Sequence, residues 1–442
     1  MYKVFFKTLG CPKNEVDSEY MSGSLKIQDK FKIVDKAKES DVIVVNTCGF
    51  INDAKEESIE TIFDALYYKE NGYCSAVIVT GCLTQRYFEE IKNEIPEIDA
   101  ILGTGNFDKL DKVIENVMNG NNIYEVPEDP SFDYKSTLPR NYSNDFSSYL
   151  KIAEGCNNNC TYCTIPQIRG RLNSRPIEDL VKEAKEMINQ GIKEIIIIAQ
   201  DITQYGVDIY DESRLVDLLE KLASLKGVKW IRLLYAYPER IDDDLINIIK
   251  KEDKICNYLD IPIQHSVKNI RNKMGRKGDS KYLFNLINKL RNEIPDIVLR
   301  TSLIVGFPQE TEEDFKKLVD FVKKIRFSRL GVFKYSKEEG TPAYHMNNQV
   351  DEEIKEYRYN KIMKTQQKIS LENNKKLIGE ELEVLVTKKD EKYYKARSQY
   401  DAPEIDNQIY LEGESLNIGD FVKCKITDAS DYDLFATVIK ES

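Results

Sequence analysis

Three cysteines lie close together in the segment GCNNNCTYCTIP (155–166). They are Cys156, Cys160 and Cys163. Thiolates are soft ligands that select zinc, copper(I) or iron–sulfur clusters, and a structural zinc site normally closes its shell with four ligands. Zinc would therefore need a distant fourth ligand, such as His265 or His345. A four-iron cluster on three cysteines keeps one iron open for a substrate or cofactor, whereas an electron carrier usually fills all four positions. The motif thus favours a catalytic cluster.

Three further cysteines each follow a predicted strand. They are Cys11, Cys48 and Cys82. The carboxyl ends of parallel strands share one edge of an open sheet, so these thiols, separated by 37 and 34 residues, could converge in space. Free cysteine is also a common core residue at the end of an apolar strand. The residues by themselves leave a core role and a ligand role equally open.

The pattern of hydrophobic residues changes three times along the chain. Residues 1–125 alternate short β-branched runs with helical patterns, which predicts a parallel α/β unit. Residues 126–147 are polar and proline-containing, as in a linker. Residues 148–370 carry six strand-and-helix units, which predicts a full or partial barrel with its active site at the carboxyl ends of the strands. Residues 371–442 read as a small all-β barrel of the OB type. The six central strands are expected near 149–155, 194–201, 229–237, 258–264, 298–306 and 329–335.

Length and charge limit the possible classes of protein. A chain of 442 residues suggests about three domains. The first residues lack the features of a signal peptide, and no apolar run approaches the roughly 18 residues of a membrane helix, so we expect a soluble, cytoplasmic protein without a membrane partner. In that compartment the nine cysteines are expected to be metal ligands or redox groups rather than disulfides. The net charge of −11 weighs against a nucleic-acid partner.

The spacing of the central cysteines resembles the signature of the radical S-adenosylmethionine superfamily. The resemblance implies a [4Fe–4S] cluster on these cysteines, S-adenosylmethionine on the open iron, an electron donor, and a radical that abstracts hydrogen from unactivated carbon. It also implies that residues near the strand ends contact S-adenosylmethionine, although a core or ion-pair role stays open for each of them. These residues are Gln200, Asp201, Gln264, Arg300 and Gly306. His265 is a candidate general base, but a histidine at a strand end is more often structural, and no other catalytic side chain is evident beyond the clusters.

The whole chain resembles a narrower family, the methylthiotransferases. The segments TLGCPKNEVDSE (8–19), VNTCGFI (45–51) and VTGCLTQR (79–86) match its N-terminal motifs. The resemblance implies a second [4Fe–4S] cluster on Cys11, Cys48 and Cys82, a radical domain, and a C-terminal TRAM barrel. It further implies two S-adenosylmethionine molecules, one as the methyl donor and one as the radical source. The remaining cysteines are expected to be packing residues. They are Cys74, Cys256 and Cys424.

The substrate depends on which branch of the family the chain resembles. The segments YLDIPIQHSVKNIRNKMGR and ARSQYDAPEID (396–406) resemble the RimO-type branch, which modifies the β-carbon of an aspartate in small-subunit ribosomal protein twelve, free or within the ribosome. Residues 371–442 hold 10 Lys and Arg against 16 Asp and Glu, which suits a basic protein better than RNA. Two alternatives remain: a tRNA adenosine methylthiotransferase, and a non-catalytic iron–sulfur or zinc protein that binds a partner.

Overall fold

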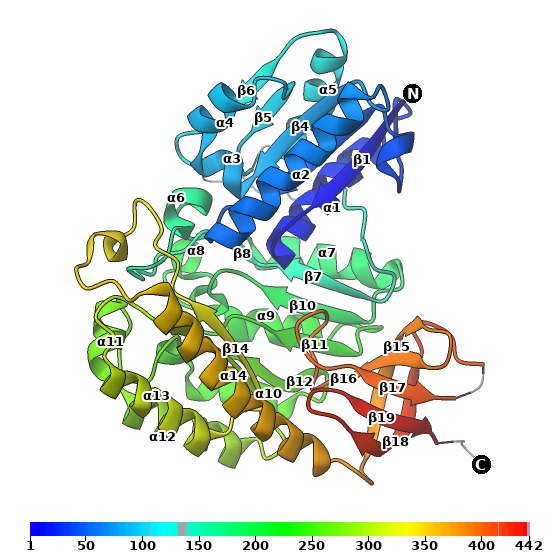
Figure 1. Cartoon of the computed structure of the whole chain (residues 1–442). Coiled ribbons are helices and arrows are strands. Elements are labelled where there is room, and N and C mark those ends of the chain that lie inside the picture. The colour runs from blue at the N-terminus through cyan, green and yellow to red at the C-terminus, as the bar shows by residue number, and fades with distance from the viewer. Residues whose placement is uncertain (106, 131–138, 414, 440–442) are drawn as a thin grey trace.

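The computed structural model describes residues 1–105, 107–130, 139–413 and 415–439. Part of the expected linker, residues 131–138, lies outside these ranges. Along the described chain, an N-terminal parallel sheet is followed by a second parallel sheet and then by a small barrel (Figure 1). None of the described helices is both long enough and apolar enough to cross a membrane.

The N-terminal sheet has the strand order β2-β1-β3-β4-β5-β6 in the described residues, and all its neighbouring strands are parallel. Its central strands have the sequences VIVVNT and AVIVTG and are buried throughout, as expected for a sheet with helices on both faces. Strand β2 lies on one side of β1, and β3 and all later strands lie on the other side. Open α/β sheets bind ligands at such a change in strand order, here between β1 and β3. The elements are β1 (Tyr2–Thr8), α1 (Pro12–Lys26), β2 (Phe31–Ile33), β3 (Val42–Thr47), α2 (Asn52–Glu70), β4 (Ala76–Gly81), α3 (Cys82–Arg86), α4 (Phe88–Glu94), β5 (Ala100–Leu102), α5 (Leu110–Met118) and β6 (Ile123–Glu125).

The central sheet has the order β14-β13-β12-β11-β10-β7, so in the described chain its strands follow one another in sequence and are all parallel. Helices between the strands cover its outer face, and the long α14 runs from this unit towards the barrel (Figure 1). The strands and short hairpin are β7 (Ser147–Lys151), β8 (Ala153–Glu154), β9 (Asn173–Ser174), β10 (Glu194–Ile198), β11 (Trp230–Leu233), β12 (Ile255–Asp260), β13 (Val298–Val305) and β14 (Arg329–Lys334). The helices are α6 (Ile165–Arg169), α7 (Ile177–Asn189), α8 (Val207–Tyr210), α9 (Leu215–Ala223), α10 (Asp243–Lys251), α11 (Lys268–Lys273), α12 (Ser280–Glu293), α13 (Glu312–Ile325) and α14 (Glu352–Lys375).

The C-terminal strands close into a barrel in the order β15-β16-β17-β19-β18. The barrel packs on the central sheet, where the rings of Trp230 and Phe421 meet edge to face with centroids 4.7 Å apart. Closure removes the exposed sheet edges that a small all-β unit would otherwise leave. The strands are β15 (Glu381–Lys389), β16 (Tyr394–Ser398), β17 (Ile409–Glu412), β18 (Phe421–Ala429) and β19 (Leu434–Val438).

The fold class expected from the sequence is confirmed: a parallel α/β unit, an open six-stranded parallel α/β sheet and an all-β barrel make up the described chain. Three short strands, β2, β6 and β9, were not expected. The domain boundaries stay a prediction, and α14 runs without a break through the boundary placed at residue 370.

One apolar core is shared by all three units. Its members include Val16 and Tyr20 of α1, Ile196 and Trp230 of the central sheet, and Leu385 and Ala402 of the C-terminal unit. Helix α1 accordingly lies against the central sheet as well as its own (Figure 1). The three units therefore bury apolar surface against one another, in addition to being connected by the chain.

A buried carboxylate fastens the barrel to the central sheet. Glu194, at the start of β10, is fully buried and accepts hydrogen bonds from Arg232 Nε at 2.8 Å, Arg397 Nη2 at 2.5 Å and Ser147 Oγ at 2.7 Å. Burial by itself would raise the pKa of Glu194, but the two guanidinium groups outweigh it and lower the pKa to about 2. Because this carboxylate holds an arginine from each unit, its removal would leave two buried positive charges without their partner.

We expect Glu194→Gln to lower the free energy of unfolding by about 3–5 kcal/mol near neutral pH, measured by chemical denaturation. The matched control is Glu383→Gln, which removes an exposed ion pair with Lys229 between the same two units and should cost less than about 1 kcal/mol. A folded-state pKa below the unfolded value stabilises the protein above the unfolded pKa. The difference between wild type and Glu194→Gln should therefore shrink as the pH falls from about 4.5 towards 2. Equal losses in both variants would contradict this account.

Candidate active site

The N-terminal cysteine set, Cys11, Cys48 and Cys82, lies at the carboxyl ends of the adjacent strands β1, β3 and β4. Gly10 has a positive φ of 89°, and a Cβ there would lie 3.0 Å from Cys48 Sγ, so the chain can bring the first two cysteines together only with glycine at this position. Cys11 and Cys48 both act electrostatically on Cys82. The structure thus brings together the three thiols that the sequence placed at separate strand ends.

One amide ties together the three segments that carry this set. Asn14 is fully buried, and its Nδ2 donates hydrogen bonds to Leu9 O and Thr47 O, both at 2.9 Å. Its Oδ1 lies 3.6 Å from Cys82 Sγ. Leu9 and Thr47 precede Cys11 and Cys48 in the chain, so a single side chain fixes the relative positions of all three cysteines.

The central cysteine set, Cys156, Cys160 and Cys163, lies in the loop after β8. Cys163 N donates to Cys160 O at 3.1 Å, and both other thiols act electrostatically on Cys163. The loop is anchored to the end of α11, where Thr161 donates from N to Met274 O at 3.1 Å and from Oγ1 to Lys273 O at 2.6 Å. Within the described residues, no three His, Cys, Asp or Glu side chains are placed to hold a single metal ion.

Asp201 and Gln200, predicted to contact S-adenosylmethionine, lie beside the central cysteine loop. Asp201 is buried and accepts hydrogen bonds from Asn158 Nδ2 at 2.8 Å and Arg240 Nη1 at 2.9 Å, so it holds the segment between the first two cysteines of the set. Gln200 Nε2 donates to Glu154 Oε1 at 2.5 Å. Gln200 Oε1 is buried and has no hydrogen-bond partner among the described residues.

The other three residues predicted to contact S-adenosylmethionine are Gln264, Arg300 and Gly306, which lie on or after strands β12 and β13. Gln264 has a positive φ of 66° and joins β13 through Ile304 N, which donates to Gln264 O at 2.7 Å. Gly306 N donates to the carboxylate of Glu310. His265 is fully buried, and its Nδ1 accepts from Val267 N at 3.1 Å, which suits a structural role.

Arg300 is surrounded by carboxylates from two units. Its Nη1 lies 2.9 Å from Asp260 Oδ1, and its Nε lies 3.6 Å from Asp406 Oδ1 of the DAPEID segment. Asp401 of the same segment pairs with Arg329 Nη2 at 2.7 Å, and both aspartates are almost fully buried. The structure therefore places these two acidic residues of the segment in the contact between barrel and sheet. A contact from Arg300 to S-adenosylmethionine stays a prediction.

A buried ion-pair network connects the two cysteine sets. Arg169, at the end of α6, donates from Nη2 to Cys82 Sγ at 3.4 Å and to Asn14 Oδ1. Its Nη1 pairs with Asp17 at 2.6 Å and with Glu154 at 3.0 Å. Glu154 precedes the central cysteine loop by two residues, so a chain of hydrogen bonds runs from Cys82 to the start of that loop.

Both sets fit an iron–sulfur cluster by the chemistry of their thiols. Burial raises the pKa of Cys82 to about 12, and Arg169 opposes this shift. Burial likewise raises the pKa of Cys163 to about 12. Buried thiols of this kind stay protonated unless a metal displaces the proton and supplies positive charge. Each set offers three thiols, which matches a cluster with one open iron.

The sequence did not single out several residues that the structure places between the sets. They are Lys13, Asn14, Asp17, Lys151, Glu154 and Arg169. The signal available was the occurrence of charged residues inside or beside apolar strands and next to cysteines. Lys151, for example, lies within a strand that is buried throughout. Burial lowers the pKa of the Lys13 ammonium, and the nearby Cys11 opposes that shift.

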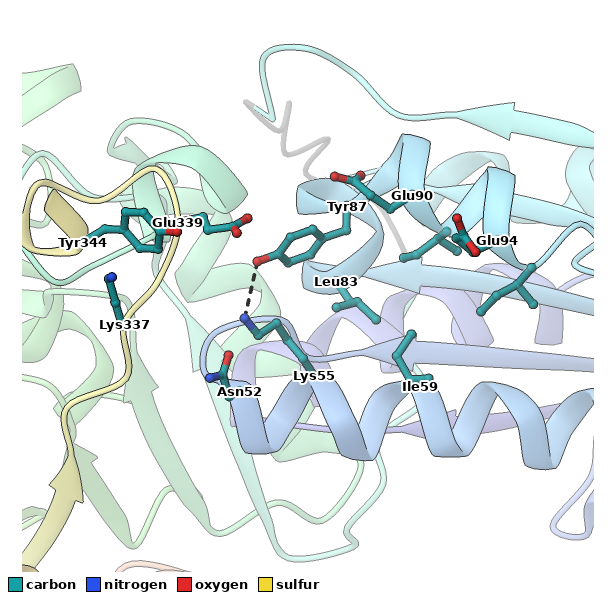
Figure 2. Close-up of a pocket in the computed structure, with 12 residues that line it drawn as sticks. Asn52, Lys55, Ile59, Leu83, Tyr87, Glu90, Glu94, Lys337, Glu339 and Tyr344 are labelled. Atoms are coloured by element: carbon teal, nitrogen blue, oxygen red, sulfur yellow. Dashed lines mark hydrogen bonds between the residues drawn. The ribbon is translucent and has the colours of Figure 1, made fainter. Parts of the chain in front are cut away.

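A pocket of about 590 Å³ opens beside the N-terminal cysteine set, between α2, α3 and α4 on one side and the segment after β14 on the other (Figure 2). Its wall includes Leu83, which follows Cys82. Lys55 Nζ donates to Tyr87 Oη at 3.4 Å across the pocket and pairs with the buried Glu338 at 3.0 Å. Arg86 also pairs with Glu338 at 2.6 Å, so buried charges join the N-terminal and central units here.

Comparison with known proteins identifies the class of enzyme. Residues 150–322 match the model of the Radical SAM superfamily, residues 378–439 match the TRAM domain, and residues 3–103 match the model described as Uncharacterized protein family UPF0004. The solved structure of the radical S-adenosylmethionine methyltransferase TsrM from Kitasatospora setae covers 77% of each chain with a TM-score of 0.57. At 13% identity that likeness shows the fold alone. The chain is a radical S-adenosylmethionine enzyme, a class that uses an iron–sulfur cluster and S-adenosylmethionine.

Full-length relatives narrow the class to a family. The protein named ribosomal protein uS12 methylthiotransferase RimO of Clostridioides difficile (strain 630) is 49% identical over 444 residues and covers 100% of both chains. A protein of the same name from Desulforamulus reducens is 50% identical over 432 residues, covering 97% of each chain. The chain therefore belongs to the RimO family of methylthiotransferases, which confirms the resemblance found in the cysteine motifs.

Loss of the Asn14 amide should weaken cluster binding by the N-terminal cysteine set. In a background with Cys156, Cys160 and Cys163 replaced by alanine, we expect Asn14→Ala to reduce the affinity for a reconstituted cluster by about 10–100-fold. The measurement is iron content and visible absorbance against rising chelator concentration. The control is Asn116→Ala, which removes an exposed side-chain amide that donates to Lys112 O within α5. Unchanged cluster retention in Asn14→Ala would show that the amide does not organise this set.

Proposed function

We propose that this protein attaches a methylthio group to the β-carbon of an aspartate in ribosomal protein uS12. In this proposal the N-terminal and central cysteine sets each hold a [4Fe–4S] cluster. Two S-adenosylmethionine molecules take part, one as the methyl donor and one as the radical source. The observation that carries the proposal is the presence of two three-thiol sets joined through Arg169. The name of the full-length relatives supports the choice of uS12.

The side chains around the two sets have distinct tasks in this reaction. When bound, the clusters supply the electron that cleaves S-adenosylmethionine and the site where sulfur is held. Asp201 orients the central loop through Asn158 and Arg240. Gln200 Oε1 offers a buried acceptor with no partner in the described chain, suited to an N–H donor of S-adenosylmethionine. The reaction also needs an electron donor from outside this chain.

The charge around the pocket suits a basic protein substrate. Glu90, Glu94 and Glu339 line it, and their carboxylates have no ion pair among the described residues (Figure 2). Lys55 is already paired with Glu338, which leaves Lys337 as the counter-charge among the described lining residues. A pocket with this charge attracts Lys and Arg side chains and repels phosphates. It supports a protein partner, either free uS12 or uS12 within the small subunit.

A competition experiment tests the substrate. We expect anaerobically reconstituted enzyme, given reductant and S-adenosylmethionine, to place a methylthio group on an aspartate of uS12 when small ribosomal subunits and unmodified tRNA are offered together. Mass spectrometry of both products gives the answer. Modification of the tRNA with uS12 unchanged would overturn the substrate assignment.

The two-cluster part of the proposal has its own test. Cys160→Ala should abolish cleavage of S-adenosylmethionine but keep the iron bound to the N-terminal cysteine set, because Cys160 contacts Tyr237 of the central unit and not the N-terminal set. Cys424→Ala, which alters a buried thiol inside the barrel, should change neither property. Loss of all iron in Cys160→Ala would count against two independent sites.

A further inference from the structure

The segment 268–281, which includes α11, is a basic stretch in an acidic chain. It holds six Lys and Arg residues against one Asp, whereas the whole chain has a net charge of −11. Its two arginines are buried: Arg271 pairs with Glu239, and the guanidinium of Arg276 lies 3.6 Å from the centroid of the Tyr237 ring. The other four cations are named the lysine patch; all but the partly buried Lys273 are exposed, and the four are Lys268, Lys273, Lys277 and Lys281.

The segment that carries the lysine patch packs on the central cysteine loop. A Cβ at Gly275 would lie 2.3 Å from Asn159 O and 3.4 Å from Cys160 Cα, so the two segments approach this closely only with glycine at this position. Thr161 Oγ1 also donates to Lys273 O at 2.6 Å. The loop reaches the surface here, because Asn159 is exposed and Cys160 is partly exposed. Positive charge therefore borders the exposed part of the central cysteine loop.

The stability of the fold does not explain these charges. In the described parts of the chain, the four ammonium groups of the patch form no ion pair and no hydrogen bond. Lys268 and Lys281 act electrostatically on Asp279, but that carboxylate already accepts from Tyr282 N as the cap of α12. Lys281 lies in the first turn of α12, where the helix dipole favours acidic residues and opposes a cation. The patch therefore keeps its charge available to a molecule outside the chain.

We propose that the lysine patch docks the protein that delivers the electron to the central cysteine set. This inference deepens the proposed function, in which an electron donor from outside the chain is needed. The partner that fits is a small redox protein whose surface is acidic around its redox group. It gives up one electron, and the cluster on the central cysteines accepts that electron, so no bond is formed or broken in this step.

The position of the patch favours an electron carrier over RNA, which lysines also attract. Electron transfer requires the two redox groups to come close, and the patch borders the exposed part of the loop that carries the central cysteines. Complexes of electron carriers are small, and opposite charges guide their formation, so four lysines suffice for such a contact. The acidic barrel lies on the other side of the central unit from α11, so its negative charge is remote from the patch (Figure 1).

Association without turnover is the first readout. A purified bacterial flavodoxin, which is a small acidic flavoprotein, is mixed with the reconstituted full-length enzyme without oxygen at several salt concentrations. The patch variant combines Lys268→Gln, Lys277→Gln and Lys281→Gln. The control variant changes the net charge equally at three exposed lysines of α7 and of the segment after α9, by combining Lys182→Gln, Lys185→Gln and Lys226→Gln. At low salt we expect the association rate constant to fall about 10-fold in the patch variant and less than about 2-fold in the control, with a smaller difference at high salt.

Electron delivery is the second readout, followed as cleavage of S-adenosylmethionine in the absence of uS12. With limiting reduced flavodoxin, cleavage should be about 10-fold slower in the patch variant than in the control variant. Reduced methyl viologen, a small cation that needs no docking surface, should support similar rates in wild type and both variants. Iron content shows that both cysteine sets hold their clusters in each variant.

Equal association of flavodoxin with the patch and control variants would overturn the inference, and so would the absence of measurable binding by the wild-type enzyme at low salt. The same variants are also titrated with small ribosomal subunits. A patch variant that loses affinity for the subunits but associates normally with flavodoxin would assign the lysines to RNA and refute the donor site. Modification of tRNA in the competition experiment would refute the proposed substrate only, because these assays contain no substrate protein.

Discussion

The guanidinium of Arg169 is the interaction on which the rest of the site depends. It is fully buried in the central unit, yet it reaches a cysteine and the carboxylate of Asp17 in the N-terminal unit. Such a charge is tolerable only with its partners in place, so the two units must come together in one register for either to be stable. The same residue links the two cysteine sets through its bonds to Cys82 and Glu154. Folding and the assembly of a two-part site are therefore one requirement.

The polar groups of the site fall into two kinds: those that pair with one another inside the protein, and those that are available to bound molecules. Asp17, Lys151, Glu154 and Arg169 form ion pairs with one another inside the protein. Around them, Gln200 Oε1 has no hydrogen-bond partner in the described chain, and none of the six thiols of the two sets forms a disulfide. The paired charges form a rigid frame, and the unpaired groups mark the surfaces that face bound molecules.

Sequence reasoning found the strands and the convergence of the thiols, because both follow from local pattern and parallel topology. The strands β2 and β6 escaped it, since three-residue strands at a sheet edge carry no periodic signal. The sequence left both a contact to S-adenosylmethionine and an ion-pair role open for Arg300; its pairing with Asp260 and Asp406 depends on where the barrel sits, which no local motif encodes. Asn14 was missed for the same reason: its three partners come from segments far apart in the chain.

The burial of Asp401 and Asp406 bears on how such enzymes can diversify. These aspartates belong to the C-terminal unit, but their partners, Arg329 and Arg300, belong to the central sheet. A barrel without these two aspartates would leave both arginines facing a mismatched surface. Recombination that treated the barrel as an exchangeable module would thus be selected against, and barrel and sheet should be inherited together.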